Sequence, residues 1–217
     1  MNYYPIYLNL KNKQCVLIGG GTVGYRKALK LIEAGADLTI ISPALCSELM
    51  SLACDNKFTH INRRYQSGDL DNAFIAITAT NDESLNAIIS KEAICPINAV
   101  DMPEYCTFIL PSIIQKGDLN IAVSTSGVSP ALARTLRLQI EDYIEKIYSN
   151  RLEKYLSYLK SFRDKVFSLN LITEKREAVL KFAGSIDAIT LLNKHGLSAI
   201  KDQLERQLEI FVEHGEK

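Results

Sequence analysis

CVLIGGGTVGYRKALKLIEAGA, residues 15–36, joins an apolar run to a helical pattern through three consecutive glycines. The first five residues are typical of a short buried strand, whereas Ala28, Leu31 and Ile32 recur at the spacing of one helix face. Gly35 then indicates the end of that helix. Glycine packs poorly and is costly to order, so four glycines within six positions indicate a ligand that needs bare backbone.

Gly19, Gly21 and Gly24 have the GxGxxG spacing of dinucleotide-binding loops. The first glycine permits a tight turn after the strand, the second lets a pyrophosphate approach the backbone, and the third lets the helix pack on the sheet. The N-terminus of the helix would present free N–H groups to the phosphates. The strand before the loop and the helix after it favour dinucleotide binding over the alternative, a glycine-rich turn needed only for packing.

The first hundred residues alternate strand and helix patterns, which is the order of a parallel sheet covered by helices. After the first unit, strands are predicted at 37–41, 58–62, 73–80 and 95–100, and helices at 42–53 and 82–93. We therefore expect an α/β fold in three parts: a Rossmann-like parallel sheet domain, a small α/β segment and an all-helical C-terminal domain. The expected bounds of these parts are 1–112, 113–148 and 149–217.

The pattern changes after Asp101. Strands are predicted at 108–110 and 119–125, with a turn at 116–118 between them. Ser129 is a good N-cap and Pro130 suits the first turn of the long helix that follows. The apolar stripe of this helix could pack on its own sheet or on a second copy of the chain. The remaining chain is predicted to be helical, with stops at Gly196 and Gly215.

The composition restricts the classes of partner. Lys plus Arg number 25, as do Asp plus Glu, so the formal net charge is zero, which argues against nucleic acid as the main partner. No apolar run reaches the ~18 residues of a membrane span, and the first residues do not read as a signal peptide. The five cysteines show no CxxC spacing, which disfavours a disulfide framework or a zinc site. We expect a cytoplasmic protein.

The second predicted strand lacks the acidic residue that usually binds the ribose hydroxyls of NAD. It ends in Ser42, Pro43 and Ala44, so a ribose contact would come from the Ser42 side chain or from backbone. No Arg occurs between Asp37 and Arg63, and the one Lys, Lys57, lies beyond the helix predicted after this strand, so nothing near the strand end is expected to hold a 2′-phosphate. NAD is therefore the predicted cofactor, rather than NADP.

Ligands of such sheets lie outside the carboxyl ends of the strands. The glycine loop, Thr80 in TATND (78–82) and the segment around Asp101 are therefore expected to open onto one crevice. Asp101 is the one carboxylate directly at the end of a predicted central strand, and Asn98 lies beside it. This carboxylate could act as a general base or metal ligand, or it could merely cap the loop before Pro103. The residues leave both roles open.

A second polar loop, STSGVSP (124–130), precedes the long predicted helix. Its hydroxyl groups and the helix N-terminus suit anionic groups, and arginines follow within two turns. The candidate residues are Ser124, Thr125, Ser126, Ser129 and Arg134. An ordinary serine-capped helix with solvated arginines is the alternative, and it stays open. No catalytic histidine pairing and no metal-ligand spacing occurs, so no metal site is predicted.

Three blocks of the sequence together resemble a known family. They are YPIYLNLKNKQCVLIGGGTVGYRKALKLIEAGA, NAVDMPEYCTFILPSII and IAVSTSGVSPALARTLR. In this order they are similar to precorrin-2 dehydrogenase, the module that also forms the N-terminal half of fused siroheme synthases. The resemblance covers roughly residues 1–145. It implies oxidation of precorrin-2 to sirohydrochlorin with NAD in siroheme biosynthesis; some members also insert ferrous iron.

The resemblance also implies roles for single residues. NAD would contact the glycine loop around Thr22 and Val23, and the chain at Pro43 and Ala44. Asp101 would be the catalytic residue. Asn98 would line the tetrapyrrole site. The hydroxyl groups of the STSGVSP loop and the Arg134 guanidinium would bind the carboxylates of the substrate. Members are homodimers, which makes 113–148 a dimerisation segment. Iron insertion stays open, with weak or no chelation expected.

One alternative belongs to a different class: a non-catalytic regulatory dimer that senses NAD. The glycine loop and the long helix would serve either protein. The block around Asp101 and the STSGVSP loop favour the enzyme, because a sensor has no need of a carboxylate beside a tetrapyrrole.

Overall fold

A computed structural model describes residues 3–213, which form two compact units. The first unit comprises the chain up to Leu110 together with Ser126–Val128, and the second comprises Pro111–Thr125 and the chain from Ser129 onward. The expected division into three domains, with boundaries at 112 and 148, stays a prediction.

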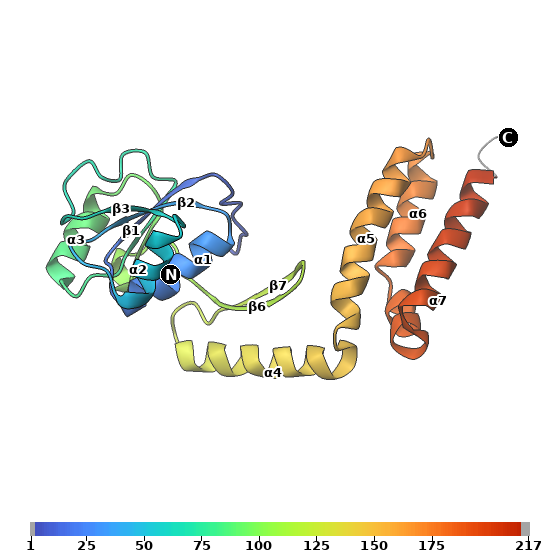
Figure 1. Ribbon diagram of the computed structural model, residues 1–217. Helices are drawn as coiled ribbons and strands as arrows, with labels where there is room; N and C mark the ends of the chain where they lie inside the picture. The colour runs from blue at the N-terminus through green and yellow to red at the C-terminus, as the bar shows by residue number, and fades with distance from the viewer. Residues whose placement is uncertain (1–2, 214–217) are drawn as a thin grey trace. The chain divides into compact units, whose positions relative to one another are not determined.

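The first unit is built on a five-stranded parallel sheet, which confirms the predicted Rossmann-like α/β fold (Figure 1). The strand order is β3-β2-β1-β4-β5, so successive strands step away from β1 first on one side and then on the other. This reversal creates the switch point at which such sheets bind ligands. The strands are β1 (Gln14–Ile18), β2 (Asp37–Ile41), β3 (Thr59–Ile61), β4 (Ile75–Thr78) and β5 (Ile97–Ala99).

β1 is buried on both faces of the sheet. Cys15 and Leu17 belong to one apolar cluster and Val16 and Ile18 to another, because successive side chains of a strand point to opposite faces. The helices α1 (Thr22–Glu33) and α2 (Ser47–Cys54) pack into the first cluster, and α3 (Glu83–Glu92) packs into the second. No helix within residues 3–213 is long and apolar enough to span a bilayer.

Two predictions near β5 are wrong. The strand lies at the edge of the sheet and not at its centre, because β4 pairs with β1 and leaves β5 with a single neighbour. Residues 108–110 do not form a strand. Instead, the Ile97 N–H donates to the Thr107 hydroxyl (2.7 Å), and the Asn98 side chain donates to the Phe108 carbonyl (3.0 Å). These side chains and one backbone hydrogen bond, from the Thr107 N–H to the Ile97 carbonyl (2.9 Å), hold this segment against β5 in place of a regular ladder. A short 3₁₀ helix (Pro103–Tyr105) leads into the segment.

The second unit begins with an antiparallel hairpin of β6 (Ser112–Lys116) and β7 (Leu119–Val123). Its turn lies where the sequence predicts it, and Gly117 there has a φ of +57°, which favours glycine. The long helix α4 (Pro130–Tyr148) follows. The Ser129 hydroxyl accepts the Leu132 N–H (3.2 Å), which confirms the predicted N-cap.

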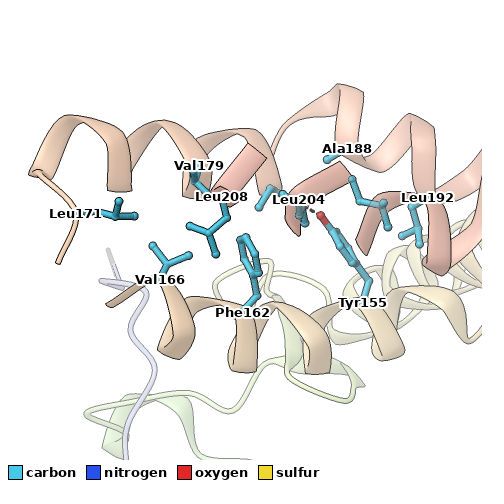
Figure 2. Close-up of a cluster of buried hydrophobic side chains, with 11 residues drawn as sticks. Tyr155, Phe162, Val166, Leu171, Val179, Ala188, Leu192, Leu204 and Leu208 are labelled. Atoms are coloured by element: carbon cyan, nitrogen blue, oxygen red, sulfur yellow. Dashed lines mark hydrogen bonds between the residues drawn. The ribbon is translucent and has the colours of Figure 1, made fainter. Parts of the chain in front are cut away.

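Three helices complete the second unit: α5 (Arg151–Ser168), α6 (Thr173–Ala183) and α7 (Ile186–Glu213). The predicted stop at Gly196 is a break inside α7, where φ is +84°. The stop predicted at Gly215 lies outside the described residues. Figure 2 shows Tyr155 and Phe162 of α5 pointing into a core shared with the other two helices, and the Tyr155 hydroxyl donates to the Ala183 carbonyl (2.7 Å). Apolar burial therefore stabilises the helical region independently of the sheet.

Phe162 and Phe167 provide a matched test of this core. Phe162 is 1% exposed, whereas Phe167, on the same helix, is 48% exposed and faces the guanidinium groups of Arg163 and Arg176. We expect Phe162→Ala to lower the free energy of unfolding by about 3–5 kcal/mol, because it leaves a cavity. Phe167→Ala should cost less than about 1 kcal/mol. Urea unfolding followed by far-ultraviolet circular dichroism measures both, and equal losses would contradict the packing.

Candidate dinucleotide-binding site

A cleft of about 710 Å³ opens at the carboxyl edge of the parallel sheet. Its walls come from the segments that follow four successive strands in the chain. They are the glycine loop after β1, the chain between β2 and α2, the residues after β3, and the loop between β4 and α3; the lining residues include Gly19–Gly21, Ser42–Cys46, Arg64, Tyr65 and Ala79–Asp82. Six of the nine predicted cofactor residues line it: Gly19, Gly21, Ser42, Pro43, Ala44 and Thr80.

The glycine loop has little room for side chains. Gly19 has a φ of +118°, and a Cβ added there would fall on the carbonyl group of Ala79. A Cβ on Gly24 would fall on the Gly19 carbonyl oxygen, so α1 could not pack so closely on β1. A Cβ on Gly21 would meet no protein atom within 4 Å. The predicted tight turn and close helix packing are thus confirmed, and the backbone at Gly21 is open to the cleft.

The N-terminus of α1 is not capped by a side chain. Gly21 occupies the N-cap position, and the first turn contains no acidic residue that would compete with an anion. Thr22 and Val23 form this first turn, but neither is among the residues that line the cleft. The first N–H groups of a helix have no intrahelical acceptor, and the helix dipole favours negative charge there. This end of α1 is therefore suited to a phosphate group.

Gly20 is needed for a contact that its spacing alone does not reveal. A Cβ there would fall on the Ala44 carbonyl oxygen and within 2.8 Å of the Ser42 hydroxyl. The Gly20 carbonyl also accepts the Cys46 N–H (2.7 Å). The run of three consecutive glycines was the available signal, since GxGxxG requires no glycine at the middle position. Gly20 joins the loop after β1 to the loop after β2.

Ser42 is 7% exposed and its hydroxyl donates to the Ala44 carbonyl (2.7 Å). The Ser42 carbonyl lies 3.0 Å from the His60 ring Nε2, at hydrogen-bonding distance. The serine is thus held from two sides, and its hydroxyl proton is already used within the loop. A ribose contact here would rely on the Ser42 oxygen as an acceptor or on the backbone of Pro43 and Ala44.

Arg64 brings a positive charge to the same wall, which the sequence analysis missed. It lies after β3, and β3 pairs with β2 in the sheet. The expectation that nothing near the second strand holds a 2′-phosphate stays a prediction, but a neighbouring strand supplies a cation to the cleft. The rule that ligands lie at strand ends was the signal that could have found it.

The opposite wall is formed by the loop after β4 and is braced internally. The Thr80 hydroxyl lies 2.7 Å from Asn86 Oδ1, and the Asn86 amide donates to the Thr80 carbonyl (3.0 Å). The Asp82 carboxylate caps α3 by accepting the Leu85 N–H (2.9 Å). The bonds to Asn86 hold Thr80 at the rim of the cleft. The Asp82 carboxylate has a structural role as a helix cap.

Asp101 is exposed and follows β5 in a left-handed conformation, with a φ of +61°. Its turn is closed by the Met102 N–H on the Ala99 carbonyl (3.2 Å), and the Cys106 sulfur accepts the Ala99 N–H (3.2 Å). The charge of Asp101 also acts on Lys27 of α1. Burial and the positive charge of Arg26 lower the pKa of Lys27, and the negative charge of Asp101 opposes this shift. We expected the glycine loop, Thr80 and Asp101 to open onto one crevice. The glycine loop after β1 and Thr80 after β4 line the cleft, whereas Asp101 after β5 does not.

The other predicted substrate residues have local roles in the structure. Asn98 is 8% exposed and donates to the Phe108 carbonyl. The Thr125 hydroxyl both donates to the Ser129 carbonyl and accepts the Ser129 N–H, each at 3.0 Å. Ser124 and Ser126 have polar interactions, and Arg134 is exposed on α4. Their role in substrate binding stays a prediction. Residues 3–213 contain no group of three or more potential His, Cys, Asp or Glu metal ligands.

The chain is similar to known protein families and to proteins of known name. A family described as "Putative NAD(P)-binding" matches residues 6–112, and one described as "Sirohaem biosynthesis protein central" matches residues 116–143. The chain is 36% identical, over 214 residues and 96% of its length, to a siroheme synthase of Thioalkalivibrio sulfidiphilus (strain HL-EbGR7). The chain belongs to the siroheme synthase N-terminal module family.

The chain is also 39% identical over 170 residues to a siroheme synthase of Nitrosomonas europaea, with 76% of the chain covered. It spans only 42% and 35% of the lengths of these two curated relatives. A solved structure described as "SirC, precorrin-2 dehydrogenase" has the same fold, with a TM-score of 0.78. The match covers 94% of the module and 100% of that chain at 21% identity.

Gly24 and Gly21 allow a test of the loop geometry. Gly24→Ala should lower the free energy of unfolding by about 1–3 kcal/mol, because the added methyl group overlaps the Gly19 carbonyl and must displace α1 or β1. Gly21→Ala should change it by less than about 0.5 kcal/mol, since its methyl group meets no protein atom. Urea titration of both variants measures the difference. A Gly24→Ala protein as stable as the parent would show that the approach is not tight.

Proposed function

We propose that this module is an NAD-dependent precorrin-2 dehydrogenase, which oxidises precorrin-2 to sirohydrochlorin in siroheme biosynthesis. The observation that carries the proposal is the uncapped N-terminus of α1 behind a bare glycine loop that lines a cleft of about 710 Å³. The names of the related siroheme synthases and of the SirC structure support the choice of substrate. The cytoplasm is the proposed location, because all five cysteines are free thiols.

NAD would fit the cleft together with the first turn of α1. The N–H groups of Thr22 and Val23 would hold the pyrophosphate, and the open backbone at Gly21 would allow it to approach. Ser42, Pro43 and Ala44 would contact the adenosine half, and Thr80 the side toward the nicotinamide. When bound, NAD supplies the hydride acceptor, so the protein's task is to align the substrate and exclude water.

Asp101 is the proposed proton acceptor. Its exposed carboxylate stands on a left-handed turn, a conformation that is uncommon for residues other than glycine but that Asp tolerates. Such outliers concentrate at functional sites, because the fold must hold them in place. Here the Ala99 and Cys106 hydrogen bonds hold the turn. Asp101 would take the proton that leaves the macrocycle together with the hydride.

Precorrin-2 is rich in carboxylates, and the loop 124–130 offers groups that suit them. The hydrogen bonds between Thr125 and Ser129 shape this loop, and Ser126 and Gly127 adopt positive φ angles there. The proposed donors are Asn98, Ser124, Thr125, Ser126, Ser129 and Arg134. An arginine and the N-terminus of α4 would give the loop an attraction for anions that the neutral net charge of the chain does not provide.

We also propose that the module is a homodimer through residues 113–148. Large apolar side chains are exposed in this segment: Ile113, Leu132, Leu136, Leu138 and Tyr143. A second copy that covers them would bury apolar surface that a monomer leaves in water. Sedimentation equilibrium should then give the mass of two chains, and a single-chain mass at micromolar concentration would contradict the dimer.

An anaerobic absorbance assay with precorrin-2 tests the function. The sirohydrochlorin spectrum should appear only when NAD is present. A second cuvette with added ferrous iron asks whether siroheme forms, and we expect no insertion above the uncatalysed rate, because Asp101 is the sole carboxylate proposed to assist it. If folded protein binds NAD but neither spectrum changes, the module is better described as a regulatory NAD sensor.

Asp101→Asn separates catalysis from loop structure. Asn tolerates the left-handed conformation as Asp does, so the turn should persist while the carboxylate is lost. We expect kcat to fall by about 100-fold or more, with the dissociation constant for NAD unchanged within about 3-fold. Asp55→Asn, which removes an exposed carboxylate at the end of α2, is the control and should retain full activity. An active Asp101→Asn protein would return Asp101 to a capping role.

A further inference from the structure

We propose that the cleft also accepts NADP, and that Arg64 is the residue that binds its 2′-phosphate. The inference rests on the proposed function, because it needs the dinucleotide site of that proposal. It concerns which dinucleotides the site takes. It makes Arg64 a specificity-determining residue in place of the acidic residue that is missing at the end of β2.

The sheet places Arg64 beside the end of β2. Ile41 and Ile61 are partners in the parallel register, and the Ser42 N–H donates to the Ile61 carbonyl (3.2 Å). The chain after β3 therefore runs alongside the chain after β2, and both line the cleft. In dinucleotide-binding folds the end of β2 meets the adenosine ribose, where an acid binds the 2′-hydroxyl or a nearby Arg accommodates a 2′-phosphate.

The backbone that carries Arg64 is held in position. Arg63 forms a two-pronged ion pair with Asp69 (2.7 and 2.8 Å), and its guanidinium also donates to the Arg64 carbonyl (3.0 Å). The Gln66 N–H donates to the same carboxylate (2.8 Å). Arg63 lowers the pKa of Asp69, so this carboxylate stays ionised and paired. Asp69 is therefore occupied by Arg63 and does not neutralise Arg64.

The charges along the cleft favour an added phosphate at this end. Among the described lining residues Arg64 is the one cation and Asp82 the one carboxylate. Asp82 comes from the β4 side, where it caps α3. The β2 side has Ser42, Pro43 and Ala44, none of which would repel a phosphate. The Arg64 side chain is exposed and has no ion-pair or hydrogen-bond partner among residues 3–213, so it can turn toward a ligand.

Isothermal titration calorimetry with NAD and NADP tests the inference without any turnover. NADP should bind the unmodified protein within about tenfold of NAD. Arg64→Ala should weaken NADP by about 10- to 100-fold, the usual effect of losing hydrogen bonds to a charged group, and should change NAD by less than about 3-fold. Arg64→Lys should recover part of the NADP affinity. Lys57→Ala, which removes an exposed charge outside the cleft lining, should alter neither.

A pair of fragments isolates the phosphate itself. Adenosine 2′,5′-bisphosphate should compete with the dinucleotide better than adenosine 5′-monophosphate, and Arg64→Ala should abolish that advantage. Binding of NAD without NADP would overturn the inference and leave the proposed function intact. NADP binding that Arg64→Ala does not weaken would overturn the role of Arg64. Failure of the folded protein to bind either dinucleotide would overturn both this inference and the proposed function.

Discussion

The structure of the sheet unit depends on the close approach of backbone to backbone at the glycine loop. Gly19 lies against the Ala79 carbonyl, Gly24 against the Gly19 carbonyl, and Gly20 against the Ala44 carbonyl. The loop thereby joins the ends of β1, β2 and β4 without side chains between them. A cleft is left above it, and the first turn of α1 is available for a phosphate.

This arrangement explains why the polar residues around the cleft divide into two kinds. Residues of the first kind form hydrogen bonds within the protein. Asp82 caps α3, Asn86 braces the loop after β4, His60 lies against the Ser42 carbonyl, and Asp69 pairs with Arg63. Only groups left without such a partner can attract a ligand at little desolvation cost. The N–H groups of α1 and the guanidinium of Arg64 are of this second kind.

Asp101 illustrates a different constraint. It follows an edge strand, and the chain must turn there because β5 has no further neighbour. Cys106 and Thr107 hold that turn through β5 backbone, so the carboxylate projects from a strained but well-supported position. The free Cys106 thiol is half-buried, and burial raises its pKa, which suits a structural rather than a nucleophilic role.

The sequence by itself determined the features that depend on neighbouring residues. These are the GxGxxG turn, the strand and helix periods of the first hundred residues, the cap at Ser129 and the break at Gly196. Only the tertiary structure decided the strand order, and with it the edge position of β5, the packing requirement at Gly20 and the place of Arg64 on the same cleft as Ser42. The physical reason is that pairing between parallel strands joins distant residues, from Thr39 with Thr59 to Cys15 with Ile75, and no local period records which strands will be neighbours.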